Sequence, residues 1–417
     1  MDDILFLSHR IPFPPDKGDK IRSYHMLRHL AARHRVHLGT FVDDPDDRPY
    51  VEELQQLCAS VCAVDIDPRF ARLRSLAGLL TGEPLTVRFY RSRRLRNWVE
   101  RVLAKHSVAA VVACSSGVAQ FAPAGSGLRR IMDFVDVDSE KWRQYAKAVA
   151  GPARFIYARE ARALARFERR VAEDFDAALF ASPAEAAFFH PQAGRGRDNV
   201  YGISNGVDVD SFDPALVAEN PYPAATPVIV FTGMMDYRAN VEGVAWFADE
   251  IFPRIIERMP KARFYIVGAR PARAVRALGF RPGIHVTGRV TDVKPFIRYA
   301  HVAVAPLRIA RGIQNKVLEA LAMGTPLVGT AEAFEGIQAF PDHEQATASQ
   351  PEAFAEAVVE AVGRHDPATP DLRLREFVRE HYSWDSNLAL LDRLLTAPAA
   401  TAAADLRPGV PAMEQQA

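Results

Sequence analysis

Cysteine is scarce in this chain, whose 417 residues include only Cys58, Cys62 and Cys114. An odd and sparse set does not supply the paired bridges of a disulfide-stabilised secreted domain, and it is typical of proteins in a reducing compartment. Cys58 and Cys62 lie close together in the sequence, but their neighbours offer no second pair of ligands for a zinc ion. We therefore expect a cytoplasmic protein with no disulfide framework and no metal site.

A surplus of one charge and long apolar runs are also missing. The 52 Lys and Arg residues nearly balance the 51 Asp and Glu residues, so the net charge of +1 does not favour a nucleic-acid partner. No window reaches the ~20 apolar residues of a membrane-spanning helix, and the acidic start MDDILFLSHR does not have the pattern of a signal peptide. A hydrophobic content of 48% indicates a globular protein, and the length favours two domains.

Short apolar runs alternate with amphipathic stretches along the chain, which predicts parallel sheets with helices on both faces. The runs that predict strands are 4–8, 36–42, 61–66, 108–113, 131–134 and 177–181, followed by 228–232, 264–267, 284–287, 302–305 and 327–329. The stretches that predict helices include 21–34, 241–259, 291–299 and 314–323. A connection rich in proline, DPALVAENPYPAATP (213–227), separates the two series. We expect two doubly wound α/β domains facing a cleft, with ligands bound beyond the carboxyl ends of their strands.

The stretch RGIQNKVLEALAMGTP (311–326) predicts an anion-binding helix start. Gly312 precedes the helix, where the first backbone N–H groups have no partner and attract phosphate. Lys316 adds a point charge to this cradle, and Arg311 can add a forked guanidinium. Glu319, one turn further on, can accept two hydroxyl protons such as those of a ribose diol. The alternative is a solvated Lys–Glu pair that stabilises the helix by about 0.2–0.5 kcal/mol.

Four motifs occur in a recognisable order in the second half of the chain. They are FTGMMDYRANVEG (231–243), YIVGARP (265–271), VTGRVTDVKPFIRYAHVAVAPL (286–307) and NKVLEALAMGTPLVGT (315–330), preceded by ISNGVDVDSF (203–212). This half resembles the donor-binding half of a GT-B glycosyltransferase of family 4. The segments LSHRIPFPPDKGDKIRSYHMLRHLA (7–31) and MDFVDVDSEKW (132–142) resemble the sugar transferases associated with bacterial PEP-CTERM/exosortase and exopolysaccharide systems.

The resemblance implies a GT-B architecture and a reaction. The acceptor-side Rossmann-like domain would cover 1–206 and the donor-binding domain 207–380, with a helix at 381–396 returning to the first domain and a disordered tail at 397–417. The implied enzyme is a retaining hexosyltransferase, independent of metal and cofactor. It would move a sugar from a nucleotide-diphosphate sugar to a hydroxyl of a growing lipid-linked glycan in exopolysaccharide synthesis. A nucleotide-sugar epimerase of the same architecture, or a non-catalytic glycan- or lipid-carrier-binding scaffold, remains an alternative.

The resemblance also assigns residues in and before the predicted helix at 314–323. Glu319 would hold the ribose hydroxyls, while Lys316 and the Gly312–Ile313 backbone would hold the diphosphate. Arg311 stands where the family commonly has a first glutamate, and either pairs with phosphate or is an exposed loop residue. The nucleobase and the sugar stay unidentified.

Three further donor-side residues follow from the other motifs. Arg238 is the cation of the GMMDYRAN loop and the candidate second phosphate ligand. Gly233 would let the backbone approach the ligand closely. Val290 belongs to a loop that resembles the receiver of the nucleobase. On the acceptor side, Gly18 either approaches the phosphates or is part of a simple capped turn.

Three carboxylates, Asp133, Asp136 and Asp138, follow a predicted strand in DFVDVDSEKW. They would repel one another if all were buried, so some are candidate caps for the next helix. The alternative places Asp133 or Asp136 beside the reacting sugar and the acceptor hydroxyl, where together with Lys316 they would be the catalytic residues.

Arginine and apolar residues are interleaved over 69–105, in RFARLRSLAGLL and RFYRSRRLRNW. This composition is typical of a surface that meets anionic lipid, and a solvated helical face is the alternative. We therefore expect a cytoplasmic protein that associates peripherally with the inner face of the cell membrane.

Overall fold

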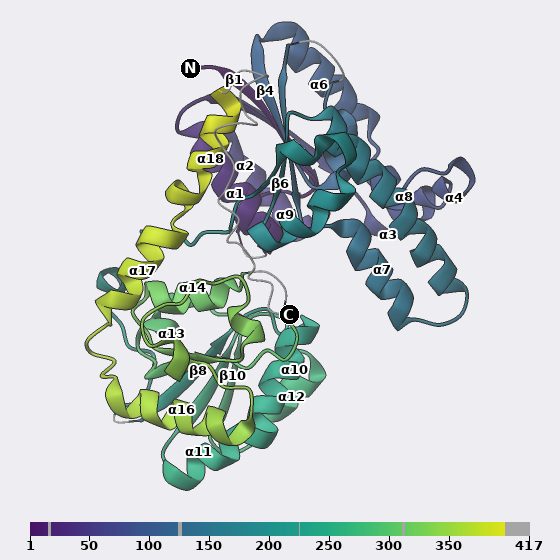
Figure 1. Cartoon of the computed structure of the whole chain (residues 1–417). Helices are drawn as coiled ribbons and strands as arrows, with labels where there is room; N and C mark the ends of the chain where they lie inside the picture. Colours follow the sequence, from purple (N-terminus) through teal and green to yellow (C-terminus); the bar gives the residue numbers. More distant parts are fainter. Residues whose placement is uncertain (16–17, 124–126, 225, 311–312, 397–417) are drawn as a thin grey trace, which may run out of the picture. The chain divides into compact units, whose positions relative to one another are not determined.

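The computed structural model describes residues 1–15, 18–123, 127–224, 226–310 and 313–396. The chain divides into two compact units (Figure 1). The first unit comprises Met1–Ile203 together with the C-terminal stretch from Leu388, and the second comprises Ser204–Asn387. Arg311 and Gly312, and the expected tail at 397–417, lie outside the described residues.

The first unit is built on a seven-stranded parallel sheet with the order β3-β2-β1-β4-β5-β6-β7. Its strands are β1 (Asp3–Ser8), β2 (Arg35–Val42), β3 (Ser60–Asp65), β4 (Val108–Cys114), β5 (Arg129–Val135), β6 (Ala177–Phe180) and β7 (Val200–Gly202). Its helices are α1 (Gly18–Ala31), α2 (Val51–Leu57), α3 (Pro68–Ser75), α4 (Gly78–Thr81), α5 (Leu85–Phe89), α6 (Arg93–Lys105), α7 (Asp138–Ala148), α8 (Pro152–Asp174), α9 (Pro183–Phe189) and the later part of α18 (Trp384–Thr396). The central strands are buried almost along their whole length, as expected for a parallel sheet covered by helices.

The second unit is built on a five-stranded parallel sheet with the order β10-β9-β8-β11-β12. Its strands are β8 (Val228–Thr232), β9 (Arg263–Val267), β10 (Ile284–Gly288), β11 (Val302–Ala305) and β12 (Leu327–Gly329). Its helices are α10 (Arg238–Trp246), α11 (Phe252–Arg258), α12 (Arg273–Leu278), α13 (Lys294–Arg298), α14 (Asn315–Ala322), α15 (His343–Ala346), α16 (Pro351–Arg364) and α17 (Leu372–Tyr382). Its core includes Phe247, whose ring packs 4.5 Å from that of Phe264 and 5.9 Å from that of Phe354 between centroids.

The α/β class with two Rossmann-like parallel sheets is confirmed, and every predicted strand is present. The prediction missed β7, in which only Tyr201 is buried, so its sequence VYG is not the continuous apolar run of a covered strand. The single helix expected over 241–259 is α10 and α11 joined by a π-helical turn at Phe247–Ile251. Pro253 follows this turn and has no N–H to continue the regular helical pattern, which is a common setting for such a bulge.

A buried ion pair fixes α1 to the sheet of the first unit. Arg22 donates from Nε and Nη2 to the two carboxylate oxygens of Asp133, at 2.8 Å each, and from Nη1 to the Ile203 carbonyl at 2.7 Å. Both side chains are fully buried. This bidentate arrangement satisfies the carboxylate inside the core, so Arg22 joins α1 to β5 and to Ile203, the last residue of the unit's N-terminal part.

We expect Asp133→Ala to lower the free energy of unfolding by about 3–5 kcal/mol, because it leaves the Arg22 guanidinium buried without its counter-charge. Urea unfolding followed by circular dichroism measures the change. Asp136→Ala is the matched control, because Asp136 is exposed and its partner Lys141 is too, so its loss should cost less than about 1 kcal/mol. Equal stability of the two variants would show that the buried pair does not hold the unit together.

Candidate functional site

Two glycines bring the loops after β8 and β9 of the second unit into backbone contact. A Cβ added to Gly268 would lie 1.7 Å from the Gly233 carbonyl oxygen, a distance that no side chain tolerates. Gly233 N–H donates to the Val267 carbonyl at 3.1 Å, and Met235 N–H donates to the Ala269 carbonyl at 2.9 Å. The loop that follows β8 is therefore held in place by its neighbour at the carboxyl edge of the sheet, where parallel sheets bind ligands.

Helix α14 places Lys316 and Glu319 on one side and apolar residues on the other. Val317, Leu318 and Leu321 are buried in the core, whereas Lys316 and Glu319 are half-buried. This division follows from the helical spacing, because positions three apart share a face. The core contact of the apolar face fixes the direction of the Lys316 and Glu319 side chains.

The Lys316 ammonium is directed at the loop after β8. Its Nζ donates to Oδ1 of Asn240 at 2.5 Å and lies 4.3 Å from the centre of the Phe231 ring. The Asn240 amide is oriented in turn by its Nδ2, which donates to the Met234 carbonyl at 2.9 Å. A Cβ on Gly233 would lie 2.7 Å from Asn240 Nδ2 and 3.4 Å from Lys316 Nζ. Glycine at position 233 thus leaves room in front of the ammonium.

The pKa values of both ionisable groups on α14 are displaced. Desolvation lowers the pKa of Lys316 to about 7, against the opposing effect of the Glu319 carboxylate. Desolvation likewise raises the pKa of Glu319 to about 7, against the effect of the Lys316 charge. Each group lies near the midpoint of its titration at neutral pH, so a charged ligand will change its protonation.

The other predicted donor-side residues lie in different surroundings. Arg238 opens α10 with a side chain that is 84% exposed, and its Nε pairs with Glu242 Oε1 at 2.6 Å. Val290 follows β10 and packs against the core of the unit, and Ile313 is buried in it. Gly233 and Lys316 are therefore the predicted residues that the structure brings together, with Glu319 near enough to act on the lysine.

Sequence reasoning assigned no role to Asn240 or Phe231, although both contact Lys316. Asn240 occupies the neighbourhood of a lysine that the resembled family has and this chain lacks. The absence of that lysine was the only feature of the sequence that pointed to Asn240. A buried amide in a helix has no characteristic spacing along the sequence by which it could be recognised.

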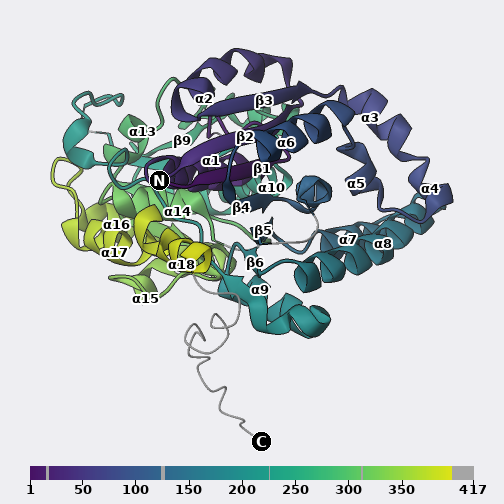
Figure 2. The same ribbon diagram turned by 90° about the horizontal axis from the view of Figure 1, so that it is seen from above.

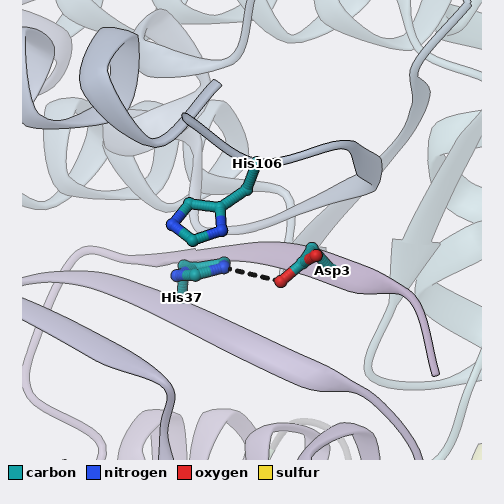
Figure 3. Close-up of side chains that lie close together, drawn as sticks. All are labelled: Asp3, His37 and His106. Atoms are coloured by element: carbon teal, nitrogen blue, oxygen red, sulfur yellow. Dashed lines mark hydrogen bonds and ion pairs between the residues drawn. The ribbon is translucent and has the colours of Figure 1, made fainter. Parts of the chain in front are cut away.

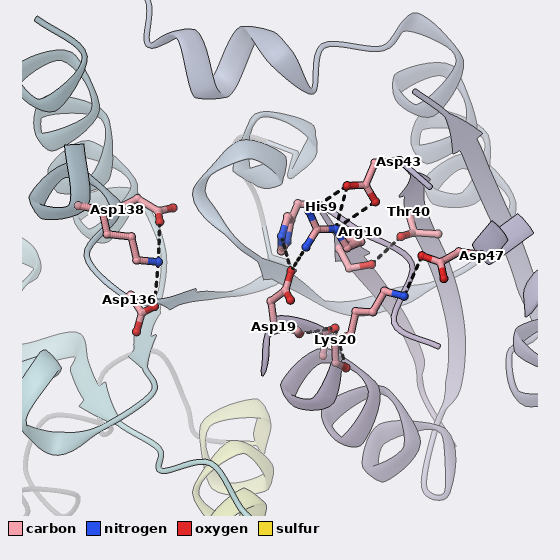
Figure 4. A network of polar contacts seen from close by, with 12 residues as sticks. His9, Arg10, Asp19, Lys20, Thr40, Asp43, Asp47, Asp136 and Asp138 are labelled. Atoms are coloured by element: carbon pink, nitrogen blue, oxygen red, sulfur yellow. Dashed lines mark hydrogen bonds and ion pairs between the residues drawn. The ribbon is translucent and has the colours of Figure 1, made fainter. Parts of the chain in front are cut away.

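A second polar cluster lies at the carboxyl ends of β1 and β2 in the first unit (Figure 4). Arg10 lies between two carboxylates: its Nη1 pairs with Asp19 at 2.7 Å and its Nη2 with Asp43 at 2.9 Å. His9 Nε2 lies 3.2 Å from the same Asp19 oxygen. Burial alone would raise the pKa of Asp19, but the hydrogen bond from His9 and the charge of Arg10 hold it well below its usual range. Asp19 is therefore a carboxylate at neutral pH. The preceding Gly18 faces open space, where a Cβ would meet nothing within 4 Å.

The three carboxylates after β5 do not act as one group. Asp133 is the buried partner of Arg22, whereas Asp136 and Asp138 bind the Lys141 ammonium at 2.8 and 3.3 Å. Figure 4 shows the last two on either side of that amine. The separation arises at Val135, whose φ of 68° is strained for a β-branched residue and redirects the chain between Asp133 and Asp136. Of the two candidate catalytic carboxylates, Asp136 is the exposed one.

Within the part of the chain that the structure describes, neither cluster contains three His, Cys, Asp or Glu side chains placed to hold a metal ion. The Lys316 ammonium is a cationic group beside the Gly233 loop, 3.4 Å from the position of a Cβ on Gly233. The site can therefore bind and polarise an anion through an ammonium and backbone groups.

We expect Lys316 to react with acetic anhydride with a midpoint near pH 7, because only the neutral amine attacks and its pKa is about 7. Pulse labelling followed by peptide mass spectrometry over about pH 5–9 measures the labelled fraction, which should rise with pH. In Glu319→Gln the midpoint should move to lower pH, since the carboxylate raises the Lys316 pKa. A midpoint above pH 9, or an upward shift in the variant, would contradict the assigned environment.

Residues 226–364, which carry the Gly233 loop and α14, match the family model of the glycosyl transferases group 1. No curated protein matches the chain.

Solved GT-B enzymes share the fold over nearly the whole chain. Sucrose-phosphate synthase from Thermosynechococcus elongatus is 17% identical, covering 94% of this chain and 98% of its own at a TM-score of 0.65. HepE from Anabaena, solved in complex with UDP, is 14% identical with coverages of 95% and 99% and a TM-score of 0.61. WaaG, a glycosyltransferase involved in lipopolysaccharide biosynthesis, is 16% identical with coverages of 95% and 100% and a TM-score of 0.60. The fold is therefore that of the GT-B glycosyltransferases.

Proposed function

We propose that this chain is a retaining glycosyltransferase that moves a sugar from a nucleotide-diphosphate sugar to a hydroxyl group. The main observation behind this proposal is the half-buried Lys316 ammonium, which has a lowered pKa and faces the Gly233 loop. This loop belongs to the domain that matches the glycosyl transferases group 1. HepE, which shares the fold, has been solved with UDP, with UDP and glucose, and with UDP-glucose. These complexes support a donor of the same class for this chain.

The proposed donor contacts follow from the chemistry of each group. Lys316 neutralises the diphosphate, with the backbone at Gly312 and Ile313 and the guanidinium of Arg311 or Arg238 as additional phosphate partners. Glu319 accepts hydrogen bonds from the ribose hydroxyls. The backbone of Gly233 approaches the diphosphate, and the loop that contains Val290 receives the nucleobase.

The cationic cradle explains how the reaction would be accelerated. Breaking the bond between the anomeric carbon and the diphosphate oxygen moves negative charge onto the leaving group. An ammonium already held in place stabilises that charge without having to reorganise at the moment of reaction. This is the task that a divalent ion performs in other transferases, so we propose a donor site that works without metal.

On the acceptor side, we propose that the acceptor hydroxyl lies at the carboxyl ends of β1 and β5. The open backbone at Gly18 approaches the substrate phosphates, and the ionised Asp19 next to it is held in place by His9 and Arg10. Asp136 is exposed and lies beside the acceptor hydroxyl in this proposal. Asp133 acts through Arg22 as a positioning residue.

We further propose that the acceptor is a lipid-linked glycan of bacterial exopolysaccharide synthesis, reached at an anionic membrane surface through residues 69–105. In this segment Phe70, Leu73 and Leu80 are exposed apolar side chains on α3 and α4, next to Arg69 and Arg72. Figure 2 shows α3, α4 and α5 at one end of the first unit. Within the described residues no helix has the length and apolar content to cross a membrane, so attachment would be peripheral.

We expect UDP or GDP to raise the melting temperature of the wild type, because a ligand that binds the folded state stabilises it by about 2.7 kcal/mol at 100 times its Kd. Glu319→Ala should weaken nucleotide binding about 10–100-fold, the effect of losing hydrogen bonds to a charged group. A thermal-shift panel of nucleoside diphosphates measures both. Glu360→Ala, an exposed carboxylate of the same unit, is the matched control and should respond like the wild type.

If no nucleotide raises the melting temperature of the wild type, the proposed donor site is wrong and the non-catalytic binding scaffold is favoured. If a nucleotide does bind, the reaction of the nucleotide-sugar identifies the activity. A transferase releases the nucleotide from the sugar only when an acceptor is present. Interconversion of donor sugars without acceptor identifies an epimerase instead.

We expect the wild type to co-sediment with vesicles containing phosphatidylglycerol, and the triple variant Phe70→Ser, Leu73→Ser and Leu80→Ser to bind at least 10-fold more weakly. Burial of one such side chain stabilises binding by about 1.5–3 kcal/mol. Phe280→Ser is the matched control, because Phe280 is 90% exposed but lies on the second unit. Equal binding of the triple variant and the control would remove the assignment of 69–105 as the membrane surface.

A further inference from the structure

Asp3, His37 and His106 form a cluster of potential metal ligands at the amino edge of the first unit's sheet (Figure 3). Asp3 begins β1, His37 lies near the start of β2, and His106 lies in the connection between α6 and β4. Because β2, β1 and β4 are adjacent in the sheet, three segments that are distant in sequence each contribute one side chain at this edge. The proposed sugar-transfer reaction uses none of them.

The ligand atoms are close enough to converge on one ion. One atom from each residue lies within 4.8 Å of the other two. A tetrahedral ion at about 2.0–2.2 Å from each ligand needs separations of about 3.3 Å. The two imidazole rings are 4.5 Å apart between centroids at an angle of 39°, so they are neither a flat stack nor fully edge-on. His106 is partly exposed in a connecting segment, and a small rotation of its side chain can close the remaining gap.

His37 has the surroundings of a metal-binding histidine. Its Nε2 lies 2.9 Å from Asp3 Oδ1, and its Nδ1 lies 2.8 Å from the Ser60 hydroxyl. Without a metal, Nε2–H donates to Asp3 and Ser60 donates to Nδ1. With a metal on Nε2, the proton moves to Nδ1 and the serine becomes the acceptor, which a hydroxyl can do equally well. Metal-bound histidines usually have such a partner on the other nitrogen, and it sets the tautomer and ring orientation.

The cluster is accessible from solvent, and the cation that competes for the Asp3 carboxylate can turn away from it. His106 lines a surface hollow of about 420 Å³ with Lys105, Ser107 and neighbouring apolar residues. Arg35 Nε lies 3.5 Å from Asp3 Oδ1, but the arginine side chain is half exposed and can turn into solvent. An ion arriving from the hollow therefore meets His106, whose ligand atom lies within 4.8 Å of those of Asp3 and the buried His37.

We propose that Asp3, His37 and His106 bind one divalent cation of the zinc class. Two neutral imidazoles and one carboxylate suit Zn²⁺ better than Mg²⁺ or Ca²⁺, which prefer oxygen ligands. The ion cross-links the first residues of β1 and β2 with the segment that enters β4. Its effect is therefore on the stability of the first unit, and it needs neither a nucleotide nor an acceptor.

Titration calorimetry with ZnCl₂ on the full chain without a histidine tag tests this proposal. We expect one ion per chain, and at least 10-fold weaker binding in His106→Ala and in Asp3→Asn. Ser60→Ala, which removes no proposed metal ligand but removes the hydrogen-bond partner of His37 Nδ1, should weaken binding about 10-fold or more by freeing the His37 ring. His190→Ala is the matched control, because it removes an exposed histidine of the same unit and should bind like the wild type.

Cobalt substitution supplies a second readout that does not depend on stability. Co²⁺ bound by two imidazoles, a carboxylate and water should give the strong visible absorption of a four-coordinate site, and this absorption should be lost in His106→Ala. Zn²⁺ should raise the melting temperature of the wild type and of Glu319→Ala alike, and EDTA should reverse it. Binding that is absent in the wild type, or equal in the wild type and His106→Ala, would overturn the proposal without affecting the donor site.

Discussion

The site of the second unit depends on the removal of water from one ammonium group. Phe231 and Asn240 occupy positions around Lys316 Nζ that water would otherwise fill, and desolvation brings the pKa down to about 7. An ammonium in this state has lost hydration, and the Asn240 amide, the face of the Phe231 ring and the Glu319 charge do not fully replace it. An anionic ligand replaces the lost hydration with a favourable charge interaction, so the site favours negative charge before any ligand binds.

This arrangement requires the backbones of residues 233 and 268 to be in direct contact. The carbonyl of Gly233 occupies the space where a side chain of residue 268 would begin, and residue 233 itself leaves open the volume before Lys316. The loop after β8 can therefore lie against the end of β9, where the N–H groups of Gly233 and Met235 donate to the carbonyls of Val267 and Ala269. A larger residue at position 268 would displace the Gly233 backbone, and one at position 233 would displace the side chains of Asn240 and Lys316. The two glycines thus connect the sheet topology to the electrostatics of the site.

The sequence predicted the sheets well and the surroundings of single residues poorly, for a physical reason. Strands of a covered parallel sheet are continuous apolar runs, and each was predicted except β7, in which only Tyr201 is buried. The burial of Asp133, in contrast, depends on Arg22, which is 111 residues away. The role of Asn240 likewise depends on Lys316, 76 residues further along. Motif order identified the α14 residues, but no local pattern reports which distant side chain will complete a site.

The two edges of the first unit's sheet carry groups with different chemistry. At the carboxyl edge, Asp19 and Asp43 are paired with Arg10, an arrangement suited to polar and charged substrates. At the amino edge lie the two imidazoles and the carboxylate of Asp3. β1 runs between these edges over six residues, which spans about 20 Å. A cation at the amino edge cannot contact a substrate at the other edge of this sheet, so it acts on the reaction only through the stability of the strands. Metal-independent transfer and metal-dependent stability are therefore compatible in one chain.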